Sequence, residues 1–158
     1  MLFGGGQENG IRSGTLAVPL IAGMAEALEV TLSKRISFLD DTVKWQSELR
    51  TTLTSLKGIR LNGVEGVPYI VSFSCVGIKS EVLVRALEDE GIYVSSKSAC
   101  SSKKEAPSRV LLAMNRNRAE AVSGIRISMG MLTTEQDITA CQKALIKVIP
   151  TLQEWLRV

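Results

Sequence analysis

The stretch YIVSFSCVGIKSEVLVRALEDEGIYV, residues 69–94, decides the fold. Residues 69–75 alternate between polar and apolar side chains and are rich in β-branched and aromatic types, which predicts a half-buried strand. A helix follows, which the hydroxyl of Ser80 can cap and which Gly91 can end in the left-handed conformation. Residues 92–94 predict another strand. A strand, a helix and a strand therefore form the centre of the expected fold.

The chain before this stretch predicts a long helical region. Residues 16–30 are almost wholly apolar, which indicates a buried helix. In residues 33–56 apolar side chains recur at helical spacing with charged side chains between them, so this part is an amphipathic helix that can continue the first one. Gly58 ends it, and residues 59–61 are a candidate short strand.

The chain after this stretch predicts two short helices and one more strand. Residues 107–114 begin with a proline, which suits the first turn of a helix, and residues 119–122 form another helical piece. Residues 124–129 alternate as a strand, with Arg126 on its polar face. An arginine in the middle of a strand either reaches solvent or meets an anion, because its charge is costly to bury unpaired.

The final helix completes the pattern. Thr133 and Gln136 form a capping box at its start, and Pro150 is expected to kink or interrupt it. The order of elements predicts an α+β fold, with a small, mainly antiparallel sheet covered by helices on one side and preceded by the long helical segment.

Length and charge limit the functions that the chain can have. It has 158 residues, enough for one domain with a sizeable core, and a net charge of only +3. This charge gives no footprint for direct nucleic-acid binding. No apolar run is long enough for a membrane span and no signal peptide is visible, so we expect a cytoplasmic protein with no membrane partner. The chain runs almost at once into a glycine-rich loop with no element before it, so we also expect this sequence to be a piece of a longer protein.

The three cysteines differ in their surroundings. Cys75 and Cys141 fall on apolar faces and are expected to pack in the core. Cys100 instead lies in residues 95–102, SSKSACSS, among small and hydroxylated side chains. Lysines close to it in sequence favour the thiolate, which is the reactive form. Cys100 is therefore either a reactive thiol or an exposed loop cysteine without a role, and no metal site is predicted.

Several short motifs resemble those of the PLP-dependent cysteine desulfurases, which are class V aminotransferases of fold-type I. They occur in the order and at the spacing of the C-terminal part of such enzymes. The matching stretches are GGGQE (4–8), RSGT (12–15), SSKSACSS (95–102), PSRVL (107–111), IRISMG (125–130) and TTE (133–135).

The resemblance implies a role for each candidate site residue. In this family a protein thiolate attacks the sulfur of L-cysteine that is bound to pyridoxal phosphate, which leaves L-alanine and a protein persulfide. Cys100 matches that thiolate, and Arg126 matches the arginine that holds the substrate carboxylate. Thr15 matches the residue that reaches the cofactor phosphate of the other subunit in a homodimer, with Gly14 and Arg12 in the same loop.

The resemblance also implies an organisation and its limits. Residues 1–15 match a cofactor and dimer-interface loop of the large domain, and residues 16–158 match the small domain with a mobile cysteine loop at 95–106. The family's Schiff-base lysine follows a histidine, and this chain has no histidine. The chain alone is therefore predicted to be inactive.

Partners and alternatives follow from the same resemblance. The sulfur acceptor is expected to be an iron-sulfur scaffold or a tRNA-thiolation enzyme. A selenocysteine lyase-like PLP enzyme and a non-catalytic module that docks a partner remain as alternatives.

Overall fold

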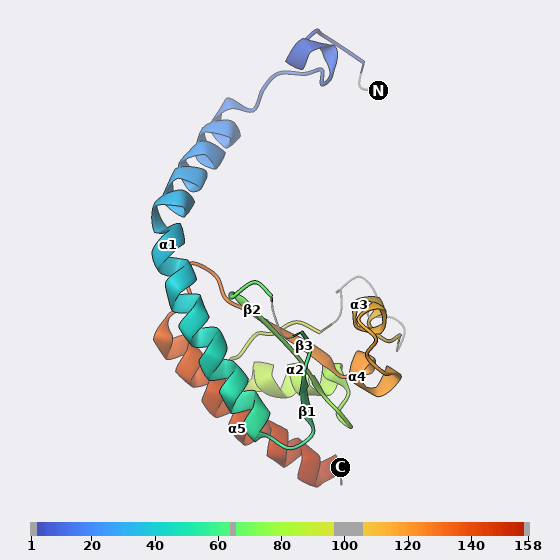
Figure 1. The fold of residues 1–158 in the computed structure, drawn as a ribbon. Helices are drawn as coiled ribbons and strands as arrows, with labels where there is room; N and C mark the ends of the chain where they lie inside the picture. Colours follow the sequence, from blue (N-terminus) through green and yellow to red (C-terminus); the bar gives the residue numbers. More distant parts are fainter. Residues whose placement is uncertain (1–2, 64–65, 97–105, 157–158) are drawn as a thin grey trace. The chain divides into compact units, whose positions relative to one another are not determined.

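The computed structural model describes residues 3–63, 66–96 and 106–156 (Figure 1). Its contacts divide the chain into two compact units, residues 1–36 and 37–158, which we describe separately. No helix in these described ranges is both long and apolar enough to cross a membrane.

The second unit is built on a three-stranded antiparallel sheet. Its strands are β1 (Ile59–Leu61), β2 (Ile70–Cys75) and β3 (Gly124–Ser128), with β2 in the middle. Val71 pairs with Ile127, and Phe73 pairs with both Ile125 and Leu61. Because paired residues share a face of the sheet, this register collects the apolar side chains on one side. The alternation expected of β2 and β3 is confirmed.

Helices cover that apolar face. They are the C-terminal part of α1 (Val18–Ser55), α2 (Ser80–Asp89) and α5 (Glu135–Leu156). The fully buried core contains side chains from all three helices and from the sheet: Leu49, Leu53, Val71, Phe73, Cys75, Leu83, Leu87, Ile125, Leu145 and Ile149. The α+β prediction, with helices on one side of a small antiparallel sheet, is therefore confirmed.

Two short helices, α3 (Arg109–Ala113) and α4 (Arg118–Val122), attach near the start of β3. Leu111 and Ala121 are their buried anchors. The hydroxyl of Ser74, on β2, donates to the carbonyl of Glu120 at 2.9 Å. A Cβ added at Gly124 would lie 2.5 Å from Cδ1 of Leu111, so the glycine allows α3 to approach the sheet. We call residues 107–123 the α3–α4 segment.

The first unit contains a short 3-10 helix, η1 (Glu8–Gly10), and the N-terminal part of α1. Its apolar side chains are exposed, among them Val18, Leu20, Met24 and Ile36, each more than 60% exposed. The expectation that residues 16–30 form a buried helix is therefore wrong as to burial. A helix that is apolar on all sides is buried only where other elements surround it, and the described residues of this unit supply only a loop with the short helix η1. The expected continuation into one long helix is confirmed.

Some expected helix ends also differ. Lys79, not Ser80, is the N-cap of α2, and Ser80 is buried inside the first turn. The capping box of α5 uses Thr134 and Asp137, one residue later than expected: Thr134 N donates to Asp137 Oδ2 at 2.8 Å, and Asp137 N donates back to Thr134 Oγ1 at 3.3 Å. The bond from Thr134 N to the carboxylate, and a second one from the Thr134 hydroxyl to Oδ2 at 2.8 Å, hold the pKa of Asp137 below its usual value.

Two further expectations are corrected. α5 runs through Pro150 to Leu156 without interruption. Residues 92–94 form no strand, and only Ser95 makes an isolated bridge, to Arg126. One bridge is too short for a ladder, although the residues have strand-like side chains. Gly58 and Gly91 adopt the left-handed angles expected where helices end, with φ of 73° and 77°.

Candidate functional site

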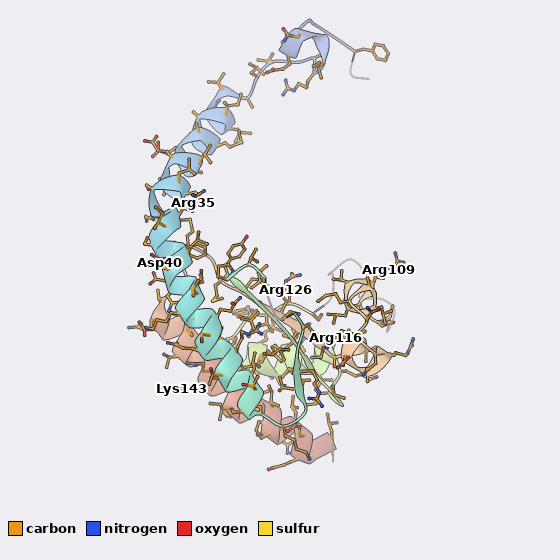
Figure 2. The ribbon with its side chains drawn as sticks, viewed as in Figure 1. Arg35, Asp40, Arg109, Arg116, Arg126 and Lys143 are labelled. Atoms are coloured by element: carbon orange, nitrogen blue, oxygen red, sulfur yellow. The ribbon has the colours of Figure 1, made fainter. Side chains whose placement is uncertain are left out.

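Arg126 lies in the middle of β3 on the face opposite the helical layer. Its neighbours in sequence, Ile125 and Ile127, point into the core, while Arg126 itself is exposed. Its side chain forms no hydrogen bond or ion pair with the residues that the structure describes. Figure 2 shows Arg126 away from Lys143 on α5. The exposure of Arg126 agrees with the alternative in which its side chain reaches solvent. Among the described residues, its guanidinium has no partner that would compete with an anion.

Serines flank Arg126 on both sides of β3. Ser72 is its direct partner in β2. On the other side, Ser95 N donates to Arg126 O at 3.1 Å and Arg126 N donates to Ser95 O at 2.8 Å. The N–H and C=O of Arg126 both face Ser95, so Arg126 and Ser72 form a non-hydrogen-bonded pair of the antiparallel ladder. In such pairs the two side chains lie closer together than in hydrogen-bonded pairs. The open face around Arg126 is polar and carries no bulky side chain from these partners.

The bridge at Ser95 is also the last described contact before residues 97–105. Cys100, the predicted nucleophile, lies in this range and therefore outside the described residues. After it the chain is held again at Ser108, whose N–H donates to Ala121 O at 2.9 Å and whose hydroxyl accepts from Leu111 N at 3.4 Å. One end of the stretch that carries Cys100 is thus bound to the arginine strand, and the other end is bound to the α3–α4 segment.

The other predicted site residues lie together in the first unit. Arg12 Nη1 donates to the carbonyls of Gly14 at 2.9 Å and Thr15 at 3.3 Å. Gly14 N donates to Gln7 Oε1 at 3.2 Å, and Gly14 has a φ of 109°, which side chains rarely allow. Arg12 therefore holds the loop in shape. The exposed hydroxyl of Thr15, for which the described residues supply no partner, is the group that remains available to an anion.

The two described cysteines are buried and chemically protected. Burial raises the pKa of Cys75 to about 11 and that of Cys141 to about 11. Thiols with such values are almost wholly protonated at neutral pH, and the protonated form is a poor nucleophile. The expectation that both pack in the core is confirmed.

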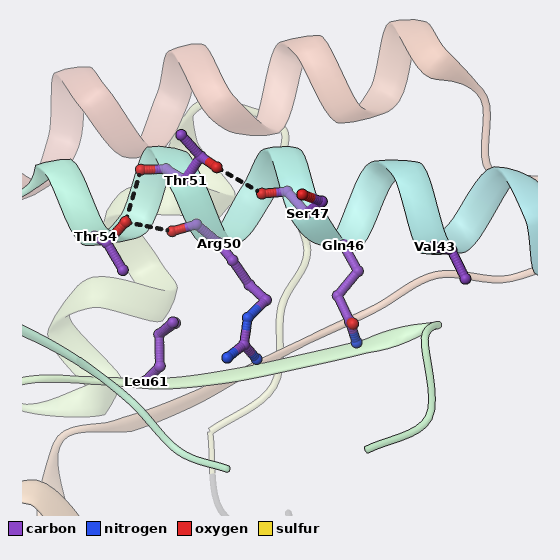
Figure 3. A pocket seen from close by; sticks show the side chains of 7 residues that line it. All are labelled: Val43, Gln46, Ser47, Arg50, Thr51, Thr54 and Leu61. Carbon is purple, nitrogen blue, oxygen red and sulfur yellow. Dashed lines mark hydrogen bonds between the residues drawn. The ribbon is translucent and has the colours of Figure 1, made fainter. Parts of the chain in front are cut away.

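Two features were not found from the sequence. A groove of about 420 Å³ lies between α1 and β1, lined by Val43, Gln46, Ser47, Arg50, Thr51, Thr54 and Leu61 (Figure 3), and it contains none of the predicted site residues. Arg116 donates from Nη2 to the carbonyl of Leu61 at 3.1 Å. Neither feature has a sequence signal, because each joins residues that are far apart in the chain.

A family comparison identifies the group to which this fold belongs. The family model for aminotransferase class-V matches residues 5–141, which is most of the chain. The chain belongs to the aminotransferase class-V family. The resemblance seen in the short motifs is thus confirmed.

Relatives within the class-V family point to one kind of enzyme. The chain is 37% identical over 155 residues to a cysteine desulfurase IscS from Pectobacterium atrosepticum, and it is 39% identical over 162 residues to a mitochondrial cysteine desulfurase from Arthroderma benhamiae. These matches cover 97% and 98% of the chain but only 38% and 31% of the relatives. The chain therefore spans well under half the length of these curated relatives.

Solved structures of class-V proteins share its fold. A NifS-like protein from Rickettsia africae superposes with a TM-score of 0.80 at 28% identity, over 95% of this chain and 39% of that one. A second NifS-like protein gives a TM-score of 0.79 at 32% identity, over 97% of this chain and 38% of that one.

Proposed function

We propose that this chain is the sulfur-accepting part of a PLP-dependent cysteine desulfurase, which converts L-cysteine into L-alanine and leaves the sulfur as a persulfide on Cys100. The observation that carries this proposal is the exposed Arg126, whose side chain has no partner among the described residues and whose backbone binds Ser95 at the start of the stretch that leads to Cys100. The kinship with proteins named cysteine desulfurases supports it.

Arg126 would bind the carboxylate of the substrate. A guanidinium remains charged at all physiological pH values and offers parallel donors that match the two oxygens of a carboxylate. The serines beside it leave the space above the strand open. The role therefore fits both the chemistry of the side chain and its place on the sheet.

Cys100 would accept the sulfur. Cys100 lies five positions after Ser95, and an extended chain of five residues spans at most about 18 Å. A substrate held at Arg126 is therefore within reach of the Cys100 thiol. In the transfer, the Cys100 thiolate forms an S–S bond with the substrate sulfur and the C–S bond breaks. The electron pair stays with the substrate carbon, which takes up a proton and leaves as alanine.

The Thr15 loop fits part of a phosphate site. The hydroxyl of Thr15 is free among the described residues, and the glycines around it allow close approach of an anion. Pyridoxal phosphate, when bound, would supply the electron sink that weakens bonds to the substrate carbon. Thr15 and Gly14 would hold its phosphate across a homodimer, with Arg12 shaping the loop. The lysine that bonds the cofactor would lie outside these 158 residues, so the chain alone would be inactive.

The setting of the reaction is part of the proposal. We place the enzyme in the cytoplasm, with an iron-sulfur scaffold or a tRNA-thiolation enzyme as the acceptor of sulfur from Cys100. Both acceptors receive the same persulfide sulfur, so neither changes the roles assigned to Arg126 and Cys100.

The direct test uses the full-length protein that contains this chain, supplied with PLP and cysteine without reductant. Peptide mass spectrometry should find one added sulfur on the Cys100 peptide, with alanine released. Cys100→Ser should abolish both the added sulfur and the steady release of alanine, whereas Cys141→Ala should change neither. Alanine without sulfur on Cys100 would remove this nucleophile from the proposal, and the absence of both products would refute the desulfurase assignment.

A further inference from the structure

The α3–α4 segment is joined to the far edge of the sheet by one side chain. Arg116, in the turn between α3 and α4, donates from Nη2 to the carbonyl of Leu61 at 3.1 Å. Directly after β1, Asn62 N bonds to Ser72 O in β2, and backbone groups alternate along an antiparallel strand. The Leu61 carbonyl therefore points away from β2, at the free edge of the sheet, and Arg116 supplies its partner.

A second connection runs beside the first. Asn62, only 7% exposed, donates from Nδ2 to Ser74 Oγ at 2.9 Å, and Ser74 Oγ donates to the carbonyl of Glu120 in α4 at 2.9 Å. The α3–α4 segment is thus tied to two adjacent residues of the chain, Leu61 and Asn62. Because it has two connections to adjacent residues, the α3–α4 segment is fixed in its orientation as well as in its distance from this edge of the sheet.

Among the residues that the structure describes, each of these connections leaves one buried polar atom without a hydrogen-bond partner. They are Nε of Arg116, a donor, and Oδ1 of Asn62, an acceptor. A buried polar group whose hydrogen bond is not made destabilises the folded state. The two atoms belong to residues that flank the same Leu61 carbonyl and have opposite hydrogen-bonding character. A single water placed between the two atoms would satisfy both, by accepting from Nε and donating to Oδ1.

The same segment holds the C-terminal end of the stretch that carries Cys100. Ser108 N donates to Ala121 O, inside the α3–α4 segment, at 2.9 Å. A displacement of this segment therefore moves the point from which the chain returns to the core after Cys100. The opposite end, Ser95, is fixed independently by Arg126.

We propose that Arg116 is a positioning residue, which together with Asn62 encloses one bound water, ties the α3–α4 segment to the edge strand β1, and so sets where the Cys100 stretch ends. The last part rests on the proposed desulfurase function. Arg116 touches neither substrate nor cofactor in this proposal, and its effect on sulfur transfer passes through Ser108.

The kinetic test uses the full-length PLP-loaded enzyme. In Arg116→Ala, single-turnover persulfide formation on Cys100 should slow by roughly tenfold or more, because small displacements of a reacting group are costly, while the KM for cysteine stays the same. Arg116→Lys should recover part of the rate, since an ammonium can still donate to the Leu61 carbonyl. Arg118→Ala, which removes an equal charge from an exposed site two residues away, should match the wild type.

Three results would overturn the proposal: a wild-type rate in Arg116→Ala, an equal loss in Arg118→Ala, or a change confined to KM. If Arg116→Ala does not fold, Arg116→Met keeps the packing of the side-chain stem and removes both donors, and the same rate is measured on it. An enzyme that makes no alanine refutes the proposed function instead of the role of Arg116.

A second readout needs no activity at all. A crystal structure of the 158-residue chain should show a water within hydrogen-bond distance of both Arg116 Nε and Asn62 Oδ1. A direct contact between these two atoms, or a gap without density, would refute the bound water.

Discussion

Arg126 and Ser95 exchange both of their backbone hydrogen bonds, at 2.8 and 3.1 Å, although 31 positions separate them in the chain. The exchange joins the strand that carries the free guanidinium to the start of the stretch that carries Cys100. The proposed role of Arg126 in binding a carboxylate and the proposed role of Cys100 in accepting sulfur therefore belong to segments that this bridge connects. Each of the two roles can be tested by a substitution at its own residue.

Arg126→Lys should weaken the use of cysteine by the full-length enzyme. A lysine keeps the charge but loses the paired donors that match a carboxylate. The loss of one charge-assisted hydrogen bond costs about 1.5–3 kcal/mol, so kcat/KM should fall by roughly tenfold to a hundredfold. Steady-state alanine release measures the effect. Arg109→Lys, the same change at an exposed position of α3, is the control, and an equal effect of both substitutions would contradict the role of Arg126.

Thiol labelling should separate the three cysteines. In the folded chain at pH 8, iodoacetamide should modify Cys100 and leave Cys75 and Cys141 unmodified, since both are buried and have pKa values of about 11. The thiolate is the form that reacts. Peptide mass spectrometry identifies the modified sites, and labelling in urea should reach all three. Modification of Cys75 before unfolding would show that the sheet core opens.

The parts of the fold that the sequence predicts well are those set by local pattern. The alternation of Val71 and Phe73 with serines identifies β2 and its buried face, because side chains in a strand point to opposite faces in turn. The tract at residues 92–94 has the same composition but forms no strand. A strand forms only where several consecutive residues pair with a neighbouring strand. Here the pairing with β3 is limited to one bridge, at Ser95 directly after the tract.

The site was predictable only in part, for a similar reason. Arg126 stands out because a charge in the middle of a strand needs an explanation, and the structure gives it an open face. Arg116 carries no such signal. Its partner is the backbone carbonyl of Leu61, 55 positions away, and a carbonyl has no sequence pattern. The sequence pattern indicated Thr133 as the N-cap, and only the geometry around Asp137 shows that Thr134 makes these hydrogen bonds instead.

The stability of the folded chain should fall as the pH rises from about 9 to about 11. Burial raises the pKa values of Cys75 and Cys141 to about 11, whereas thiols in an unfolded chain ionise near their ordinary pKa of 9.0. In this window the unfolded state loses protons that the folded state keeps, so unfolding becomes more favourable with pH. Each thiol contributes about 1.4 kcal/mol per unit of pKa difference. The contribution is fully present below pH 9 and is lost above it.

Urea unfolding at several pH values measures this loss. Cys141→Ala removes one of the two ionisable groups, so its free energy of unfolding should decline about half as steeply between pH 9 and pH 11. An unchanged slope in that variant would assign the pH dependence to other groups, such as the lysines.

Gly124→Ala should move α3 and destabilise the fold. The added Cβ would lie 2.5 Å from Cδ1 of Leu111, which is itself buried, so Leu111 has to shift. Overpacking of this kind costs about 1–3 kcal/mol, which urea unfolding can measure. Gly130→Ala is the matched control, because an added Cβ there meets nothing within 4 Å.

The double variant Gly124→Ala/Leu111→Ala should cost less than the sum of the two single changes, because the space vacated by Leu111 accommodates the new methyl group. Strict additivity would mean that Leu111 is not what the methyl group meets, and the attachment of the α3–α4 segment to β3 would then need another explanation.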